Sequence, residues 1–161
     1  MRRAKFSRPR WAAIFALVSC LAAAPPALAD ARPLHLAVLH LQFTSFTCLN
    51  QSCSLASATA VGTATSNLAT SAGTFDANLT IDFSPGGTCN IVDESDVFSF
   101  TNGSIFIHSH HEDCATHGLR IDTTFEITGG SGAFKGATGS GREFAAAPTQ
   151  PPIIFSGEIN Y

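Results

Sequence analysis

One stretch of ten residues constrains the fold most, because its polar and apolar side chains alternate strictly. From Thr74 to Phe83, a polar residue follows each apolar one. The apolar members are Phe75, Ala77, Leu79, Ile81 and Phe83. A period of two places one set on each face of a strand, so the pattern predicts a half-buried antiparallel strand. The segments 121–128 and 155–161 alternate in the same way.

Other parts of the chain also favour strands, separated by turns. Further strands are predicted at 35–43, 97–100 and 104–110, and turns at Pro85-Gly86-Gly87, Asn102-Gly103, Gly129-Gly130 and Pro148–Pro152. Asn102-Gly103 predicts a hairpin with a type I′ turn, because both residues tolerate positive φ. The small residues of 55–72 fit either a strand pair or a loop. No window has helical periodicity, so the class is all-β, a sandwich or a closed barrel.

The N-terminus has the three parts of a secretory signal. A segment with five basic residues precedes the apolar run Trp11–Ala24. Ala27-Leu28-Ala29 then supplies the small residues that a signal peptidase recognises, with cleavage expected before Asp30. We predict a signal peptide at 1–29, one domain at 30–161, and a secreted or periplasmic protein. No later stretch is long and apolar enough to span a bilayer. Alternatively, Leu17-Val18-Ser19-Cys20 fits a lipoprotein box, which would anchor the chain by a lipid on Cys20.

Charge excludes one class of partner. Five of the nine basic residues lie in the predicted signal, which leaves four against twelve acidic residues, a net charge of 4 − 12 = −8. Nucleic acids are bound mainly through lysine and arginine on phosphates. We therefore expect no nucleic-acid partner.

Four cysteines remain after the signal: Cys48, Cys53, Cys89 and Cys114. An even number in a small exported domain predicts two disulfides. Four cysteines allow three pairings, and spacing alone does not choose among them. We favour Cys48–Cys53, which closes a short loop, and Cys89–Cys114, which ties distant strands.

The stretch 127–141 (ITGGSGAFKGATGSG) is the most distinctive motif. It resembles the GGTG-x-F-x-x-A-x-G signature of the allene oxide cyclase and dirigent family, and more closely the version in secreted bacterial proteins of unassigned function. Ser131 and Ala133 depart mildly from that pattern. The resemblance covers the C-terminal third well, and it implies an eight-stranded antiparallel barrel whose lumen accepts an apolar ligand.

The composition of the motif predicts a structural role and no direct role in catalysis. Glycines permit a tight turn and close backbone approach, and Phe134 would plug one end of the barrel. The glycines concerned are Gly129, Gly130, Gly132, Gly136, Gly139 and Gly141. No helix is predicted after it, so it is not a phosphate-binding loop. The family's lumen residues match no position here, and its activities do not carry over with the motif.

A histidine cluster is the main candidate for chemistry. His108 and His110 lie two apart on a predicted strand, so both rings project from one face, a spacing that suits a metal. His111 and His117, with Glu112 and Asp113, are expected in the following loop, where they could complete a zinc or copper site. The alternative is a solvated polar loop next to a disulfide at Cys114.

Other catalytic patterns are weak. The sequence has no G-x-S-x-G nucleophile motif, and paired cysteines leave no free thiol. The run Asp93-Glu94-Ser95-Asp96 gathers three carboxylates at a predicted turn, but it lacks the ligand spacing of a calcium loop, so a solvated acidic turn is favoured.

We therefore expect a non-enzymatic secreted barrel that binds a small apolar ligand or serves an envelope or extracellular role, and that needs no cofactor. One rival is an isomerase- or cyclase-like enzyme that uses the lumen with His108 and His110 facing inward. Another is a periplasmic metal-binding protein built on the cluster from His108 to His117. Phenylalanine side chains that filled the lumen would exclude both pocket hypotheses. The oligomeric state does not follow from the sequence.

Overall fold

The computed structural model describes residues 30–83, 89–114, 120–147 and 150–161. The predicted signal peptide, His117, the turn at Pro85-Gly86-Gly87 and the first part of the predicted turn at Pro148–Pro152 lie outside the described residues.

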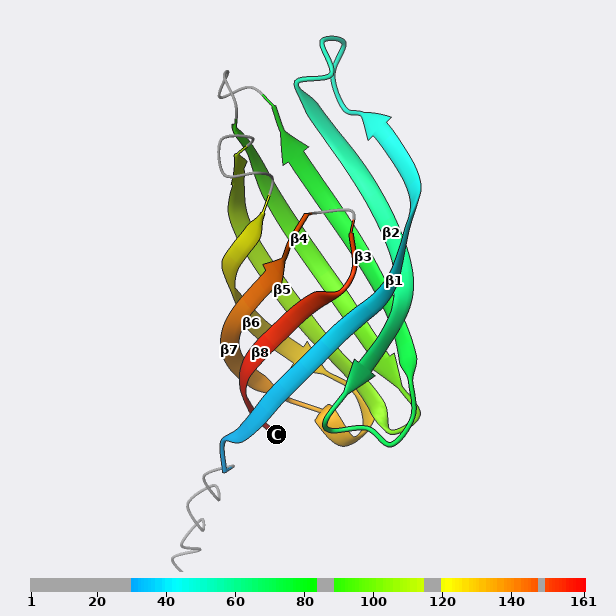
Figure 1. Cartoon of the computed structure of the whole chain (residues 1–161), viewed down its shortest axis with the longest axis vertical. Coiled ribbons are helices and arrows are strands. Elements are labelled where there is room, and N and C mark those ends of the chain that lie inside the picture. Colours follow the sequence, from blue (N-terminus) through cyan, green and yellow to red (C-terminus); the bar gives the residue numbers. More distant parts are fainter. Residues whose placement is uncertain (1–29, 84–88, 115–119, 148–149) are drawn as a thin grey trace, which may run out of the picture.

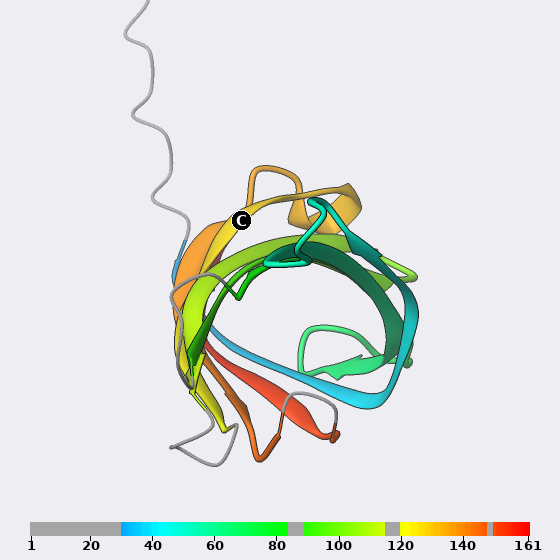
Figure 2. The same cartoon turned by 90° about the horizontal axis from the view of Figure 1, so that it is seen from above.

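The chain forms one closed antiparallel barrel of eight strands (Figures 1 and 2). The strands are β1 (Arg32–Cys48), β2 (Leu55–Ser66), β3 (Gly73–Asp82), β4 (Cys89–Phe100), β5 (Gly103–Cys114), β6 (Ile121–Gly130), β7 (Thr138–Ala145) and β8 (Ile153–Asn160). Each strand pairs with the next, and β8 pairs with β1, for example Leu36 with Phe155. The predicted all-β eight-stranded barrel is confirmed. Within the described residues, no helix is long and apolar enough to cross a membrane.

The alternating stretches are strands, as predicted, but several strands are longer than their sequence signal. The alternation of 74–83 forms β3, and the segments 121–128 and 155–161 lie largely in β6 and β8. The undecided segment 55–72 contains β2. β4 begins at Cys89, well before the expected strand at 97–100, and β1 runs on to Cys48. Register shifts between Val38 and His40 and between Phe43 and Ser45 interrupt the period of β1, because a bulge adds an unpaired residue and changes which face follows.

The β4–β5 hairpin is confirmed, but its turn is not the predicted type I′. Phe100 pairs with Gly103, so Thr101 and Asn102 form the turn. Among the described residues other than glycine, only Cys53 has a positive φ, whereas a type I′ turn would require one at Asn102. The reason is tertiary, because the motif loop hydrogen-bonds to this hairpin: Ala133 N–H donates to Asn102 O at 2.8 Å.

The motif connects β6 to β7 through a single 3-10 turn, Gly132–Phe134. Gly132 has φ +60°, and a Cβ there would lie 2.6 Å from Asn102 O. Phe134 is fully buried, with its ring 5.1 Å from that of Tyr161. The motif therefore closes the lower end of the barrel in Figure 1, which is also the end where the C-terminus lies. We call this the packed end.

Phenylalanines fill the lumen beside the packed end. Ring centroids are 5.0 Å apart between Phe75 and Phe98, 5.1 Å between Phe98 and Phe155, and 5.6 Å between Phe155 and Phe125. All four side chains are buried. Gly141 makes room for them, because a Cβ there would lie 2.6 Å from the Phe125 ring.

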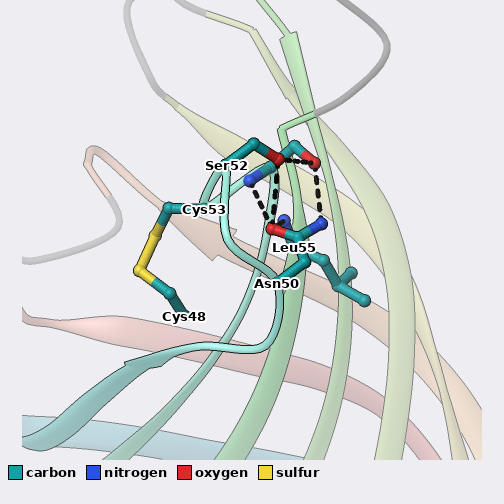
Figure 3. The surroundings of a disulfide bond; sticks show 6 residues. Cys48, Asn50, Ser52, Cys53 and Leu55 are labelled. Atoms are coloured by element: carbon teal, nitrogen blue, oxygen red, sulfur yellow. Dashed lines mark hydrogen bonds between the residues drawn. A yellow bond between two sulfur atoms is a disulfide. The ribbon is translucent and has the colours of Figure 1, made fainter.

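Both predicted disulfides are confirmed, and both lie at the opposite end, which we call the open end. Cys89 and Cys114 are cross-strand partners at the start of β4 and the end of β5. Cys48–Cys53 closes the β1–β2 hairpin (Figure 3). Inside this loop the Asn50 carboxamide accepts from Ser54 N–H at 3.0 Å and donates to Ser54 Oγ at 2.9 Å, which fixes the tip.

Candidate functional site

A cavity of about 230 Å³ occupies the open half of the lumen. The phenylalanines therefore fill only part of the barrel. One side of the cavity is apolar and comes from β1, β2 and β3. This apolar wall consists of Leu41, Phe43, Ala60, Ala77, Leu79, Ile81 and Phe83. Ala77, Leu79 and Ile81 lie on the face of β3 that the alternation of 74–83 defined, and Phe83 directly follows that strand. The sequence therefore identified the part of the wall that comes from this segment.

The other side of the cavity carries ionisable groups. This polar wall consists of Glu94 from β4, His111 and Asp113 from β5, and Glu143 from β7. Each of the four residues is at most 9% exposed. No lysine or arginine lines the cavity among the described residues. A buried wall of three carboxyl groups and one imidazole is unusual, because ionisable groups are rarely buried without a partner.

Glu94 belongs to the acidic run that was predicted to form a solvated turn, and that prediction is wrong. Residues 93–96 lie in the middle of β4. Alternation turns Asp93 outward, while Glu94 and Asp96 point into the lumen, where Asp96 is 1% exposed. The strand was not recognised here because Glu94 and Asp96 interrupt the inward face that Val92, Phe98 and Phe100 otherwise make apolar.

His111 was predicted in a loop, and this is also wrong. β5 continues to Cys114, and His111 pairs with Val92 across the β4–β5 ladder. Its Nε2 lies 3.3 Å from Asp113 Oδ1, and both side chains are largely buried. The two residues are two apart, so they share the inward face of β5.

Glu143 was missed in the sequence. It pairs with Thr123 on β6 and with Phe155 on β8, so it lies where the cavity meets the buried phenylalanines. One ligand atom each from Glu94, His111 and Glu143 lies within 4.8 Å of the other two. Three strands bring them together, and the only local signal for Glu143 was its alternation with Ala145 on β7.

Burial and mutual repulsion shift the ionisation of these groups. Burial, with the nearby Glu94 charge, raises the pKa of Glu143 to about 8. Burial also raises the pKa of Glu94, and burial with the charges of Glu94 and Glu143 raises that of Asp96 well above its usual range. Burial opposes charging of His111, but Asp113 together with the charges of Glu143 and Glu94 outweighs it, so the pKa of His111 is raised. The site therefore favours protonated carboxyl groups until a cation compensates them.

His108 and His110 share a face, but it is the outer one. Their side chains are 39% and 63% exposed, and both approach Asp93, at 3.8 and 3.4 Å. The inward orientation considered for the enzymatic alternative is therefore wrong, because the inward positions of β5 are the odd-numbered ones. The structure separates His108 and His110 from His111, so they cannot share one metal with it. Exposed pairs of this kind contribute little to stability.

A second group of potential metal ligands lies at the open end, but two of its members are joined in a disulfide bond. Cys89, Glu112 and Cys114 lie close together. The two sulfur atoms are bonded to each other, so neither is available as a thiolate. Among the described residues, the cluster of Glu94, His111 and Glu143 is the other group of potential metal ligands.

No family model matches the chain, and no curated protein matches it. Among solved structures, the chain is similar to a pyocyanin demethylase, with a TM-score of 0.52 and 12% sequence identity. The match covers 81% of this chain and all of the other. At this identity the likeness shows the barrel fold alone.

Proposed function

We propose that this protein is an exported barrel that binds a small, largely apolar molecule in the cavity at the open end of its lumen. The observation that carries the proposal is the cavity itself, about 230 Å³, with an apolar wall and a few polar groups opposite. Ligand sites typically combine these features. Pockets for drug-sized ligands measure about 300–1,000 Å³, so a smaller ligand is expected here.

The test is fluorescence titration with 1-aminonaphthalene, a small apolar amine. Trp11 is the single tryptophan and lies in the predicted signal, so the mature protein adds little background. We expect saturable binding with one site per chain. Ala60→Phe should weaken it at least tenfold, because Ala60 is 2% exposed and lines the cavity.

The matched control is Val61→Phe, on the same strand but on the outer face, where Val61 is 38% exposed. Its binding should equal that of the wild type. Ile81→Trp, nearer the mouth, fills the cavity at a less buried position and guards against misfolding of Ala60→Phe. Circular dichroism verifies the fold of each variant. Binding that does not saturate, or that both cavity-filling variants leave unchanged, would refute the proposal.

Export is supported by the signal-like N-terminus and by two disulfides, which persist in oxidising compartments. Intact mass of protein exported by a bacterial host tests it. A mass equal to residues 30–161 with two disulfides is expected. A lipid-modified N-terminus at Cys20 would indicate the anchored alternative instead.

A distant relationship to allene oxide cyclase and dirigent proteins is part of the proposal. The motif of residues 127–141 and the eight-stranded barrel support it, and the absence of a family match leaves it a proposal. The alternative of an isomerase- or cyclase-like enzyme that uses the lumen loses two of its suggested residues, because His108 and His110 face outward.

A further inference from the structure

The polar wall of the lumen presents three metal-ligating side chains that face one another. Glu94, His111 and Glu143 each place a ligand atom within 4.8 Å of the other two. Around a tetrahedral zinc, ligand atoms lie about 3.3 Å apart, because Zn–N and Zn–O bonds are about 2.0–2.2 Å long. Small side-chain rotations therefore suffice to bring all three onto one ion.

Two of these side chains have polar atoms without a hydrogen-bond partner in the described part of the chain. They are Nδ1 of His111 and Oε2 of Glu143, both buried. Glu143 is 1% and His111 8% exposed, and both line the cavity. A buried polar atom without a partner is costly, so each such atom in a native structure calls for an explanation. A bound cation would satisfy both.

The surroundings of His111 match those of a metal ligand. Its Nε2 lies 3.3 Å from Asp113 Oδ1, whereas its Nδ1 is buried without a hydrogen-bond partner, so Nδ1 is the nitrogen available to a metal. Metal-binding histidines commonly direct their second nitrogen at a carboxylate, which fixes the tautomer and the ring orientation. Asp113 would thus act as a positioning residue.

Charge favours a cation over any other occupant of this corner. Asp96 lies next to Glu94 on the same inward face of β4 and is fully buried, so it adds another carboxyl group close to Glu94 and Glu143. No cationic side chain other than that of His111 faces the cavity among the described residues. A divalent ion would reverse the repulsion among these carboxyl groups.

We propose that Glu94, His111 and Glu143 bind one divalent transition-metal ion inside the lumen, with Asp113 orienting His111. Two carboxylates and one imidazole suit zinc, cobalt, manganese or iron, and lack the thiolates that copper(I) prefers. Three protein ligands leave a coordination position open toward the apolar wall, the arrangement of catalytic rather than structural sites. This site shares His111 with the metal site predicted at His108, His110, His111 and His117, but it takes its other two ligands from β4 and β7.

The experiment is calorimetric titration of the exported, chelator-treated protein with Zn²⁺ alone, repeated with Co²⁺ to record its visible absorption. We expect one ion per chain and a cobalt spectrum typical of nitrogen and oxygen ligands. Loss of an outer partner costs about 10–100-fold in metal affinity, so Asp113→Asn should fall in that range. His111→Ala and Glu143→Gln, which remove ligands, should weaken binding by at least about a hundredfold.

His110→Ala is the matched control, because His110 precedes His111 on β5 but faces outward. It should leave the affinity and the cobalt spectrum unchanged. Glu143→Gln keeps the shape of the side chain, so loss of metal binding without loss of the folded circular dichroism spectrum identifies a ligand. No stoichiometric binding, or binding that His110→Ala abolishes while His111→Ala does not, would overturn the proposal.

The metal site does not depend on the ligand proposal. Dye binding by chelator-treated protein reports the cavity, whereas zinc and cobalt titration reports the polar wall. Metal binding without dye binding would refute only the apolar ligand, and the reverse result would refute only the metal.

Discussion

The two ends of the lumen are built from the same eight strands but in opposite ways. At the packed end, the aromatic rings of Phe75, Phe98, Phe125 and Phe155 interlock, and Phe134 closes the barrel. At the open end, the polar wall leaves buried atoms unpaired beside a cavity. The first arrangement gains stability from packing, and the second loses it through desolvation.

The difference shows how a small domain can carry an unfavourable site. The packed end supplies apolar burial, while at the open end the strands are tied by disulfides instead. Cys89–Cys114 joins β4 and β5, the two strands that carry Glu94, His111 and Asp113. Functional sites commonly lower stability in this manner, and the rest of the fold compensates.

The largest effect is expected at the packed end. Phe98→Ala should lower the free energy of unfolding by about 3–5 kcal/mol, the usual cost of removing a buried aromatic ring. Phe98 is fully buried and contacts two other rings. Urea unfolding measures it. Phe106→Ala is the control, because Phe106 is 36% exposed on the outer face, and it should cost less than about 1 kcal/mol. Equal losses in the two variants would mean that the packed end is not the main source of stability.

The next effect concerns the disulfides of the open end. Replacing Cys89 and Cys114 by serine should cost about 3.5 kcal/mol, and replacing Cys48 and Cys53 about 2 kcal/mol, because a cross-link that closes a longer loop restricts the unfolded chain more. The sequence separations are 25 and 5. The same unfolding assay compares the two double variants. A reversed order would show that the hairpin tip, rather than the β4–β5 pair, holds the open end together.

The smallest expected effect is a gain in stability. Asp96→Asn should stabilise the metal-free protein by about 1–2 kcal/mol at about pH 8, in the range of other stabilising substitutions. The pKa of Asp96 is raised above its ordinary value of 3.8, so the folded state holds a proton that the unfolded state releases. The stabilisation that protonated Asp96 gives the wild-type protein is therefore complete below pH 3.8. It is lost as the pH rises toward the pKa that Asp96 has in the folded state.

Asparagine cannot ionise, so the advantage of Asp96→Asn should nearly vanish at about pH 4 and grow with pH. Thermal unfolding in the presence of a chelator at both pH values measures this difference. A variant less stable than the wild type at the higher pH would show that Asp96 has a stabilising partner, and that the open end is not strained by its charges.

Much of the barrel could be predicted because its evidence is local. The alternation of 74–83 defined β3 and its inward face, and the alternation at 121–128 did the same for much of β6. The bounds of β1 and β4 could not be predicted. Bulges interrupt the period in β1, and the inward carboxyl groups of Glu94 and Asp96 interrupt the apolar face of β4.

The candidate site was predicted only in part. Its apolar wall follows from the pattern of β3, and His111 was among the proposed ligands, although assigned to a loop. Glu143 was not considered, because nothing near it in the sequence marks it as more than one acidic residue of a strand. Its partners lie about 30 and 50 residues away, and sequence spacing carries no information about distances across a lumen.

The sequence by itself determined the all-β class, because strand faces follow from a period of two. It also predicted two disulfides from the even number of cysteines, although spacing alone did not choose among the three pairings. Only the tertiary structure decided which residues meet inside the barrel. Closure of β8 onto β1 and the register of each ladder bring Glu94, His111 and Glu143 from three strands to one point. The same register turns His108 and His110 outward, since neighbouring residues of a strand face opposite sides.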